Sequence, residues 1–397
     1  MRRAATDKRR DLVQLVAENV DRLVNLDVSG YGVIGALYAA ARAHHKRPLT
    51  LLAAERLRAA VKPGDRVFVT SGWVMAGFYP YGETDGPVGA AALARALGLG
   101  LGARVVVLTE APMVPITMAA CRGAGVNVLT EADLERAPRP PHPKGLHCLV
   151  LRFPIDDDEA VEETRWLFER YRPKGLVAIE KNGPNVKGIY HETSGADNSD
   201  CVAKAGRLFE EAAREKVLTI GIGDRGNEIG FGAIQAVPRK LLPFGRKCTC
   251  PCGAGVVDAT TVDVLVTAAV SNWGAYEIAA RLAALLDRPE VLHDPATEAR
   301  MLRCCIDAGG IDGFTCRPVP MTDGMVVVTA NMGIGLVTPP VGICLYVACG
   351  ISGAPMERVA RPLLPFLAVM VATLFLITYL PDLTLFLPRL LLGYGSL

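Results

Sequence analysis

Four short segments of this 397-residue chain are rich in the acidic, amide and small residues that handle a charged small molecule. They span residues 82–87, 180–185, 221–230 and 271–276. Paired carboxylates can act as general acid and base when burial separates their pKa values, and amide and hydroxyl groups can orient a polar substrate. Each segment lies just beyond, or shortly after, an apolar run rich in β-branched residues. This pattern predicts a polar site in which side chains from four loops meet.

The elements that would position these loops alternate along the chain. Runs at 66–70, 104–108, 175–179, 217–221 and 262–267 are short and β-branched, as strands are. Stretches at 88–99, 157–170 and 199–215 suit helices. Alternating strands and helices predict a parallel sheet covered on both faces, in a soluble, Rossmann-like α/β domain over residues 1–323. Because ligands bind beyond the carboxyl ends of parallel strands, the four segments should share one edge of that sheet.

Each segment also has a purely structural interpretation. Thr84, Asp85 and Pro87 suit the start of a helix. Glycines in 221–230 could serve close packing, and their spacing is not that of a dinucleotide-binding loop. Glu180 and Lys181 could be an ordinary ion pair. The recurrence of the same kind of loop at successive strand ends favours function.

Charge and local sequence pattern narrow the possible classes of partner and the cellular setting. A net charge of +2 without a basic stripe argues against a nucleic-acid partner. Apolar residues recur at helical spacing from Leu12 to Val24, which predicts an amphipathic helix and not a cleaved signal. The segment 136–144, with its four prolines, is expected to be a loop. A reducing, cytoplasmic setting follows for the first domain.

Eleven cysteines are present, three of them in the run Cys248-Thr-Cys250-Pro-Cys252. Structural zinc usually takes C-x2-C pairs, and no second pair follows at a suitable distance, so we expect buried thiols and no metal at this run. His191, near the 180–185 segment, is a further candidate site residue.

The composition changes after Asp323. Residues 363–380 form an uncharged run of 18 residues, which predicts a transmembrane helix; a buried core helix is the alternative. The shorter run 341–351 predicts a re-entrant or broken segment. Arg358 and Arg361 precede the long run, against Arg389 beyond it, which predicts a cytoplasmic first domain.

Residues 83–87, 180–183, 223–228 and 270–274 together resemble the D-glutamate cyclase family, whose members interconvert D-glutamate and 5-oxo-D-proline. The resemblance covers about residues 10–323 and implies a hydro-lyase acting on an acidic amino acid. One residue departs from the family pattern, because Arg225 stands where the family usually has glycine. That side chain would crowd the loop or add a cation near a carboxylate substrate.

Residues 331–342 and 353–358, with the apolar run, resemble the end of the large membrane subunit of TRAP dicarboxylate transporters, over about residues 326–394. The tail, 324–397, is therefore expected to anchor the enzyme in the bacterial inner membrane. Two alternatives stay open. The chain could be a TRAP component that joins a small membrane subunit and a binding protein, or its first domain could bind an acidic amino acid without turnover.

The chemistry of cyclising glutamate suggests a hypothesis for the roles of the candidate site residues. Glu83 and Asp85 would serve as base and orienter at the amine, while Lys181 and the Asn227 amide would stabilise an oxyanion. Glu180 and Asp224 would act as acid or ammonium partner. These carboxylates could also hold a divalent cation, although none is required. The full catalytic set is Glu83, Asp85, Glu180, Lys181, Asp224, Asn227 and Glu228; the substrate-binding set is Ser71, Thr84, Gly86, Asn182, Gly223, Ser271 and Asn272.

Overall fold

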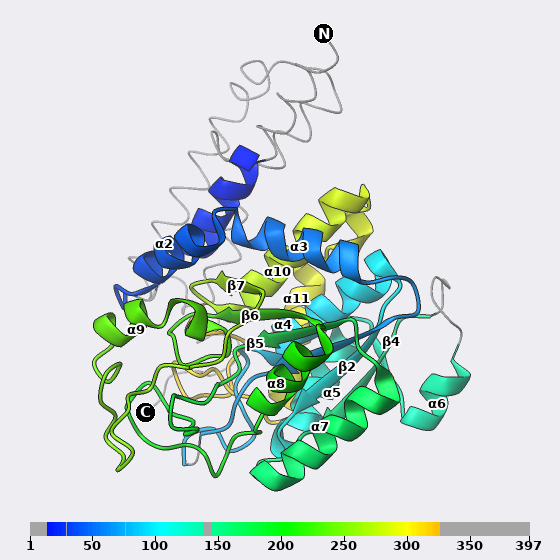
Figure 1. Cartoon of the computed structure of the whole chain (residues 1–397). Helices are drawn as coiled ribbons and strands as arrows, with labels where there is room; N and C mark the ends of the chain where they lie inside the picture. Colours follow the sequence, from blue (N-terminus) through cyan, green and yellow to red (C-terminus); the bar gives the residue numbers. More distant parts are fainter. Residues whose placement is uncertain (1–13, 29, 76, 138–144, 326–397) are drawn as a thin grey trace, which may run out of the picture. The chain divides into compact units, whose positions relative to one another are not determined.

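A seven-stranded, wholly parallel sheet organises the chain in this computed structural model, which describes residues 14–28, 30–75, 77–137 and 145–325 (Figure 1). The strand order is β3-β4-β2-β1-β5-β6-β7. Their bounds are β1 Arg66–Ser71, β2 Arg104–Thr109, β3 Asn127–Val128, β4 His147–Arg152, β5 Gly175–Ile179, β6 Leu218–Gly223 and β7 Val264–Thr267. The sheet lies within a compact unit, Val20–Gly324.

Helices cover both faces of the sheet because alternate side chains of each strand point to opposite faces. Val67 and Val69 of β1 belong to one core cluster, whereas Phe68 between them belongs to the other. The first cluster packs α2 Ile34–His45, α3 Leu49–Ala60, α4 Pro87–Ala96, α5 Val114–Gly123, α10 Ser271–Leu286 and α11 Pro295–Asp307. The second packs α6 Glu131–Arg136, α7 Asp157–Tyr171 and α8 Gly206–Glu215. Since both faces are buried, the strands are nearly continuous apolar runs.

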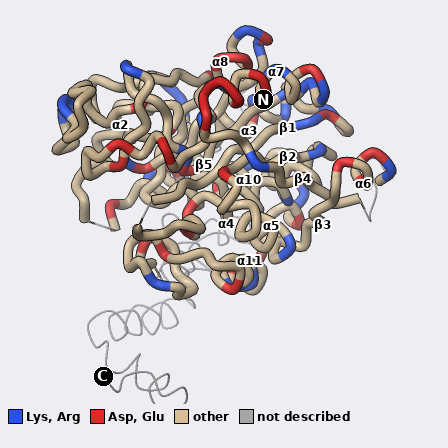
Figure 2. The backbone as a smooth tube through the Cα atoms, turned by 90° about the horizontal axis from the view of Figure 1, so that it is seen from below, with Lys and Arg blue, Asp and Glu red and all other residues tan. Residues whose placement is uncertain are grey.

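Short elements complete the unit. A π-helical turn, η1 Leu97–Leu101, extends α4, and 3-10 turns occupy η2 Ala111–Met113, η3 Phe231–Ile234 and η4 Pro289–Val291. The small helix α9 Ala236–Leu241 follows η3. Residues 14–24 are helical, as the apolar spacing predicts, and residues 20–24 of this helix belong to the unit. Figure 2 shows acidic and basic residues side by side on the outer helices α6 and α7.

Strand order places a switch point between β1 and β5. From β1 the chain moves to β2 and on to the β3 edge, and then crosses back to β5 on the other side of β1. At such a point the loops that follow the two central strands separate and leave a crevice for ligands. The loops after β1 and β5 are two of the four segments singled out in the sequence.

The predicted parallel α/β fold is confirmed, with corrections in detail. The five predicted strands correspond to β1, β2, β5, β6 and β7, whereas β3 and β4 were not predicted. Helix α8 begins at Gly206 and not at 199, because residues 199–205 are held as a loop by their own hydrogen bonds; for example, Lys204 N–H donates to the Pro154 carbonyl at 2.9 Å.

Membrane segments remain a separate question. Within the described ranges, no helix has both the length and the apolar character needed to cross a bilayer. The predicted span at 363–380 and the broken segment at 341–351 lie outside the described residues, as does 138–144 of the proline-rich loop.

Candidate active site

The four predicted segments meet at the carboxyl edge of the sheet, after β1, β5, β6 and β7 (Figure 1). A fifth segment, residues 309–324, joins them: Thr84 N–H donates to the Ile311 carbonyl at 2.8 Å, and Thr84 Oγ1 donates to the Met321 carbonyl at 2.7 Å. Strand-end reasoning missed this segment because it follows helix α11 and no strand precedes it.

Asp85 and Asn272 lock the β1 and β7 loops together by capping each other's helices. The Asp85 carboxylate accepts the backbone N–H groups of Ser271 and Asn272, at 2.9 and 2.8 Å, at the start of α10. In return, Asn272 Oδ1 accepts the N–H groups of Gly86 and Gly89, at 2.9 and 2.7 Å, at the start of α4. Both helix starts thereby satisfy donors that would otherwise be buried without partners. Asp85 and Asn272 each therefore hold the start of a helix, and their predicted roles toward a substrate stay predictions.

Gly86 is required by this arrangement. Its φ is +96°, and a Cβ added there would lie 2.7 Å from the Gly72 backbone nitrogen. Gly223, at the end of β6, is required for a different reason: a Cβ would lie 2.7 Å from Phe231 and 2.9 Å from Glu228. Both predicted binding glycines therefore allow close packing at the site.

Six buried carboxylates gather at this edge. Oxygen atoms of Asp85, Asp224 and Asp323 lie within 4.8 Å of one another, and so do those of Glu180, Asp224 and Glu228. Glu83 is the sixth and is 4% exposed. Burial, followed by repulsion from Asp323 and Asp85, raises the pKa of Glu83. Burial is likewise the first cause that raises the pKa of the other carboxyls, that of Asp323 to about 7.

Asp323 was missed as a site residue, since the sequence analysis placed it at a domain boundary. The one available signal was its Asp-Gly pair with Gly324, which repeats Asp312-Gly313 earlier in the same segment. The structure shows why the segment matters, because Asp312 accepts the Gly324 N–H at 2.8 Å and so fixes the position of Asp323.

Arg225 brings positive charge to these acids. Its Nε lies 3.5 Å from Asp224 Oδ2 and its Nη2 lies 4.0 Å from Asp323 Oδ2. The guanidinium also stacks 4.5 Å from the ring centroid of Tyr31, and the side chain stays 28% exposed. The unusual arginine therefore does add a cation at the site. One guanidinium cannot neutralise six carboxylates, so the cluster must share protons or take up a further cation.

Glu180 and Glu228 differ in how they are held. Glu180 stands directly after β5 with a φ of +48° and accepts a 2.5 Å hydrogen bond from Ser271 Oγ. Glu228 accepts the backbone N–H groups of Arg225 and Gly226 in its own loop. Glu180 is therefore linked to the β7 loop, while Glu228 shapes the β6 loop.

Lys181 belongs to a buried ion pair. Its ammonium pairs with Glu110 and donates to the Gly72 carbonyl at 2.8 Å, and both Lys181 and Glu110 side chains are 0% exposed. Glu110 also accepts Thr109 Oγ1 and the Ala203 N–H. Because the ammonium is directed to these partners, it joins the loops that follow β1, β2 and β5, and its predicted oxyanion role stays a prediction.

Asn182 and Asn227 point their amide nitrogens at one atom. Both Nδ2 groups donate to the His191 carbonyl, at 3.0 and 3.1 Å. Their Oδ1 atoms are buried and find no hydrogen-bond partner among the described residues, and the same holds for Ser71 Oγ and Asp224 Oδ1. Unpaired buried polar atoms are costly, so four of them at one edge indicate a place built for a polar ligand. Asn227 offers an acceptor here, and not the oxyanion donor that the sequence suggested.

A cavity of about 30 Å³ lies among these groups, room for about one water molecule. It is lined by Trp73, Tyr79, Glu83, Glu180, Thr193, Arg225, Asn227, Glu228, Gly313 and Asp323. Hollows of about 600 and 760 Å³ lie beside residues that precede β5 and β6, and one of about 790 Å³ lies beside Pro184, Asn185 and helix α8. We assign the site to the small cavity because Glu83, Glu180, Glu228 and Asp323 line it together with Arg225 and Asn227, whose Oδ1 is unpaired.

Comparisons with known proteins identify both parts of the chain. The family described as D-glutamate cyclase-like, C-terminal, matches residues 20–334, and the family of the DctM component of tripartite ATP-independent periplasmic transporters matches residues 310–383. The mitochondrial D-glutamate cyclase of Homo sapiens is 32% identical over 108 residues, 27% of this chain and 16% of that protein.

Two transporter proteins are similar to the tail. The isethionate TRAP transporter permease protein DctMQ of Oleidesulfovibrio alaskensis is 41% identical over 61 residues, 15% of this chain and 10% of that protein. The C4-dicarboxylate TRAP transporter large permease protein DctM of Pseudomonas aeruginosa is 39% identical over 64 residues, 16% of this chain and 15% of that protein. The chain therefore covers only a small part of these curated relatives. Because the cyclase-like match spans every strand and every loop of the acidic site, the chain belongs to the D-glutamate cyclase-like family.

Proposed function

We propose that the acidic cavity interconverts D-glutamate and 5-oxo-D-proline with release or uptake of water, as a hydro-lyase. The observation that carries this proposal is the set of six buried carboxyls with raised pKa values beside a single guanidinium. Membership of the cyclase-like family and similarity to a D-glutamate cyclase support it.

The reaction moves two protons from nitrogen to oxygen. The α-ammonium of glutamate loses both as it becomes the lactam N–H, while its nitrogen bonds to the carbon of the γ-carboxylate. One γ-oxygen leaves that carbon and takes up both protons as water, so the net charge is unchanged. Carboxyl groups whose pKa values are raised by burial can accept and return such protons.

The contacts suggest a division of labour. Glu83, which lines the cavity and carries no capping bond to a helix, is the base for the ammonium. Glu180 and Asp224 deliver protons to the leaving oxygen. The free Oδ1 of Asn227 accepts from the ammonium, and Arg225 pairs with the substrate α-carboxylate. Asp85, Asn272 and Lys181 position these groups without touching the substrate.

Substrate access requires movement, since the present cavity is too small for glutamate. The segment 309–324 is the part that must shift, because Gly313 and Asp323 line the cavity from it. Gly313 also packs so closely that a Cβ there would lie 1.7 Å from Glu83 Oε2.

The test is direct. The full-length protein is incubated with D-glutamate and, separately, with 5-oxo-D-proline, and both compounds are followed by chiral chromatography, with L-glutamate as the stereochemical control. We expect the unaltered protein to convert D-glutamate and 5-oxo-D-proline into each other, and we expect the Asp323→Asn variant to lose this activity. Tight binding of D-glutamate without conversion would instead establish the binding-domain alternative, and neither binding nor conversion would refute the proposal.

A divalent cation bound by Asp85, Asp224 and Asp323 could supply the missing positive charge. In that case chelation would abolish conversion and added Mn²⁺ or Mg²⁺ would restore it. Conversion that is insensitive to chelators would leave the substrate ammonium and shared protons as the cluster's neutralising charges.

We also propose that residues 324–397 attach the enzyme to the bacterial inner membrane, with its first domain in the cytoplasm. The DctM match and the apolar run at 363–380 support this. Full-length protein should sediment with membranes, whereas a Val371→Arg/Leu374→Arg variant should be released, since arginine at a span centre costs about 3 kcal/mol. Copurification with a small TRAP membrane subunit and a binding protein would favour a transport role.

A further inference from the structure

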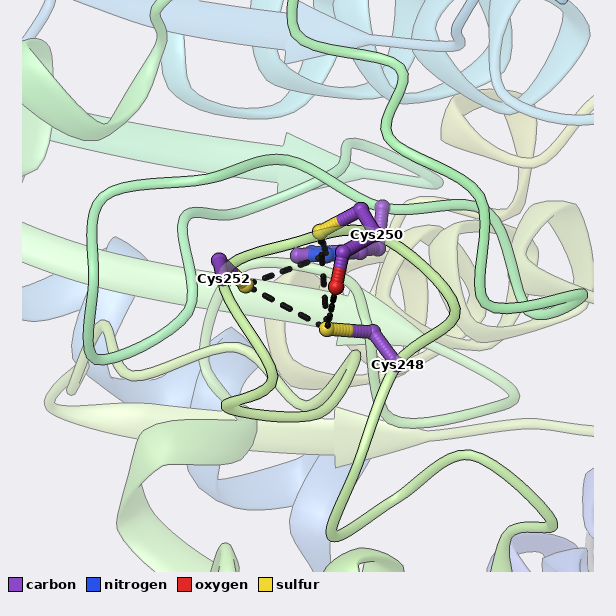
Figure 3. Close-up of side chains that lie close together, drawn as sticks. Cys248, Cys250 and Cys252 are labelled. Atoms are coloured by element: carbon purple, nitrogen blue, oxygen red, sulfur yellow. Dashed lines mark hydrogen bonds between the residues drawn. The ribbon is translucent and has the colours of Figure 1, made fainter.

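Cys248, Cys250 and Cys252 lie close together on one loop (Figure 3), and His191, from the segment after β5, joins them. Cys248 Sγ lies 3.5 Å from Cys250 Sγ and 3.2 Å from Cys252 Sγ. His191 Nε2 lies 3.2 Å from Cys250 Sγ and 3.7 Å from Cys252 Sγ. The sequence analysis expected plain buried thiols because it sought a second cysteine pair. The structure supplies the fourth group from His191, 57 residues before Cys248.

We propose that these four side chains bind one structural Zn²⁺ ion. Tetrahedral zinc, with Zn–S near 2.3 Å and Zn–N near 2.0 Å, places sulfurs about 3.7 Å apart and sulfur and nitrogen about 3.5 Å apart. The observed separations of 3.2 to 3.7 Å are close to those values, so small adjustments would admit the ion. Three thiolates and an imidazole in a tetrahedral set select zinc.

Surrounding groups prepare the ligands for a metal. His191 Nδ1 lies 3.1 Å from the Ile189 carbonyl, which places the ring proton on Nδ1 and leaves the Nε2 lone pair facing the sulfurs. Asn185 Nδ2 donates to Cys252 Sγ at 3.4 Å, and the Gly255 backbone N–H donates to the Cys248 sulfur. Such donors stabilise thiolate charge. With four protein ligands and none left open, the site is structural and not catalytic.

The ion would also stiffen the acidic site. His191 carries the carbonyl that accepts both the Asn182 and the Asn227 amides, so fixing its ring fixes the atom that orients two candidate site residues. Zinc would therefore join the 248–252 loop to the loops after β5 and β6. This consequence rests on the proposed function, whereas the presence of the metal does not.

The main alternative is redox chemistry, because Cys248 and Cys252 are close enough to form a disulfide on oxidation. A disulfide between Cys248 and Cys252 would not account for the positions of Cys250 and His191 beside them. Zinc uses all four groups, which is why we favour it.

The experiment measures metal directly. Full-length protein, purified under reducing conditions without chelators, is analysed by elemental mass spectrometry and should contain one zinc per chain. Cys250→Ser should lose that zinc, whereas the matched control Cys304→Ser, on helix α11 away from the cluster, should keep it. Exchange into Co²⁺ should give the visible absorption of a tetrahedral cobalt–thiolate centre.

A second measurement covers the case in which Cys250→Ser does not fold. In unaltered protein, titration with a mercurial reagent should release zinc in step with the loss of thiols. Three results would overturn the proposal: absence of zinc after reconstitution, a Cys248–Cys252 disulfide in protein handled under reducing conditions, or zinc that survives Cys250→Ser and disappears in Asp224→Asn. Loss of zinc without change in the acidic-site activity would refute the stiffening role alone.

Discussion

Two sets of buried charged groups lie at the same sheet edge, and they differ in how completely their polar atoms are paired. Lys181 and Glu110 form a one-to-one pair whose remaining polar atoms meet the Gly72 carbonyl, Thr109 and the Ala203 N–H. The six-carboxylate cluster faces Arg225 and leaves Asp224 Oδ1 and nearby amide oxygens unpartnered within the described residues. A fully satisfied pair holds loops in place, whereas an unbalanced cluster stores the capacity to bind or move charge.

Replacing an acid of the cluster should have the largest effect: a large loss of activity with no loss of stability. Glu83→Gln removes the proposed base, so kcat for 5-oxo-D-proline formation should fall by about 10²- to 10⁴-fold. Stability should stay unchanged or rise, since glutamine keeps the shape of the buried side chain and cannot ionise beside Asp323 and Asp85. Steady-state kinetics and thermal unfolding of the same preparation check both halves. A strongly destabilised variant would mean that the cluster, too, is structural.

Breaking the satisfied pair should have the reverse effect. Lys181→Met leaves the Glu110 carboxylate buried and uncompensated, which should cost about 3–5 kcal/mol of unfolding free energy. The double variant Lys181→Met/Glu110→Leu should recover most of that loss, because no lone charge remains. Urea unfolding of both variants measures the difference. If the single variant were stable but inactive, Lys181 would belong to the catalytic set after all.

Reciprocal capping should show a smaller effect. Asn272→Ala leaves the buried N–H groups of Gly86 and Gly89 without an acceptor, which should cost about 2–4 kcal/mol at about 1–2 kcal/mol each. Asp156→Ala removes the exposed cap of α7 and should cost about 1 kcal/mol. Thermal unfolding measures the loss of stability in both variants. Equal losses would show that a buried cap contributes no more stability than an exposed one.

The last expected effect is a change in pH dependence, which is read from the shape of a stability profile and not from a single value. Burial raises the pKa of Asp323 from 3.8 to about 7, so the folded state binds its proton more tightly than the unfolded state. The resulting stabilisation is complete below about pH 4 and is lost as the pH rises through 7. Asp323→Asn should therefore flatten the fall in stability between pH 4 and 7. An unchanged profile would place the titration on other groups.

Sequence alone predicted the parts of this arrangement that depend on local pattern. The apolar, β-branched runs predicted five of the strands, and the loops after these strands contain the candidate site residues or residues that hold them in place. The rule that ligands bind at the carboxyl ends of parallel strands then predicted that the segments of Glu83, Glu180 and Asp224 meet. It could not find β3, a two-residue strand that only its neighbour defines. It also could not choose between structural and catalytic roles for Lys181, because that depends on Glu110, 71 residues away.

Other misses share that cause. Asp323 and the pairing of His191 with the cysteine run depend on contacts between segments far apart in the chain. The spacing of residues within a single motif does not reveal such contacts. The sequence therefore predicted a domain boundary at Asp323 and no metal at the cysteine run.

The hydrogen bond from the Gly324 N–H to Asp312 has a consequence for how this gene could have acquired its tail. The last helix of the unit ends at Asp307, so a recombination just after it would preserve the folded architecture yet remove Asp323. Joining foreign sequence beyond Gly324 keeps the whole acidic cluster. If the cluster is catalytic, as proposed, an exchange of sequence that keeps the activity must therefore begin beyond Gly324 and not directly after helix α11.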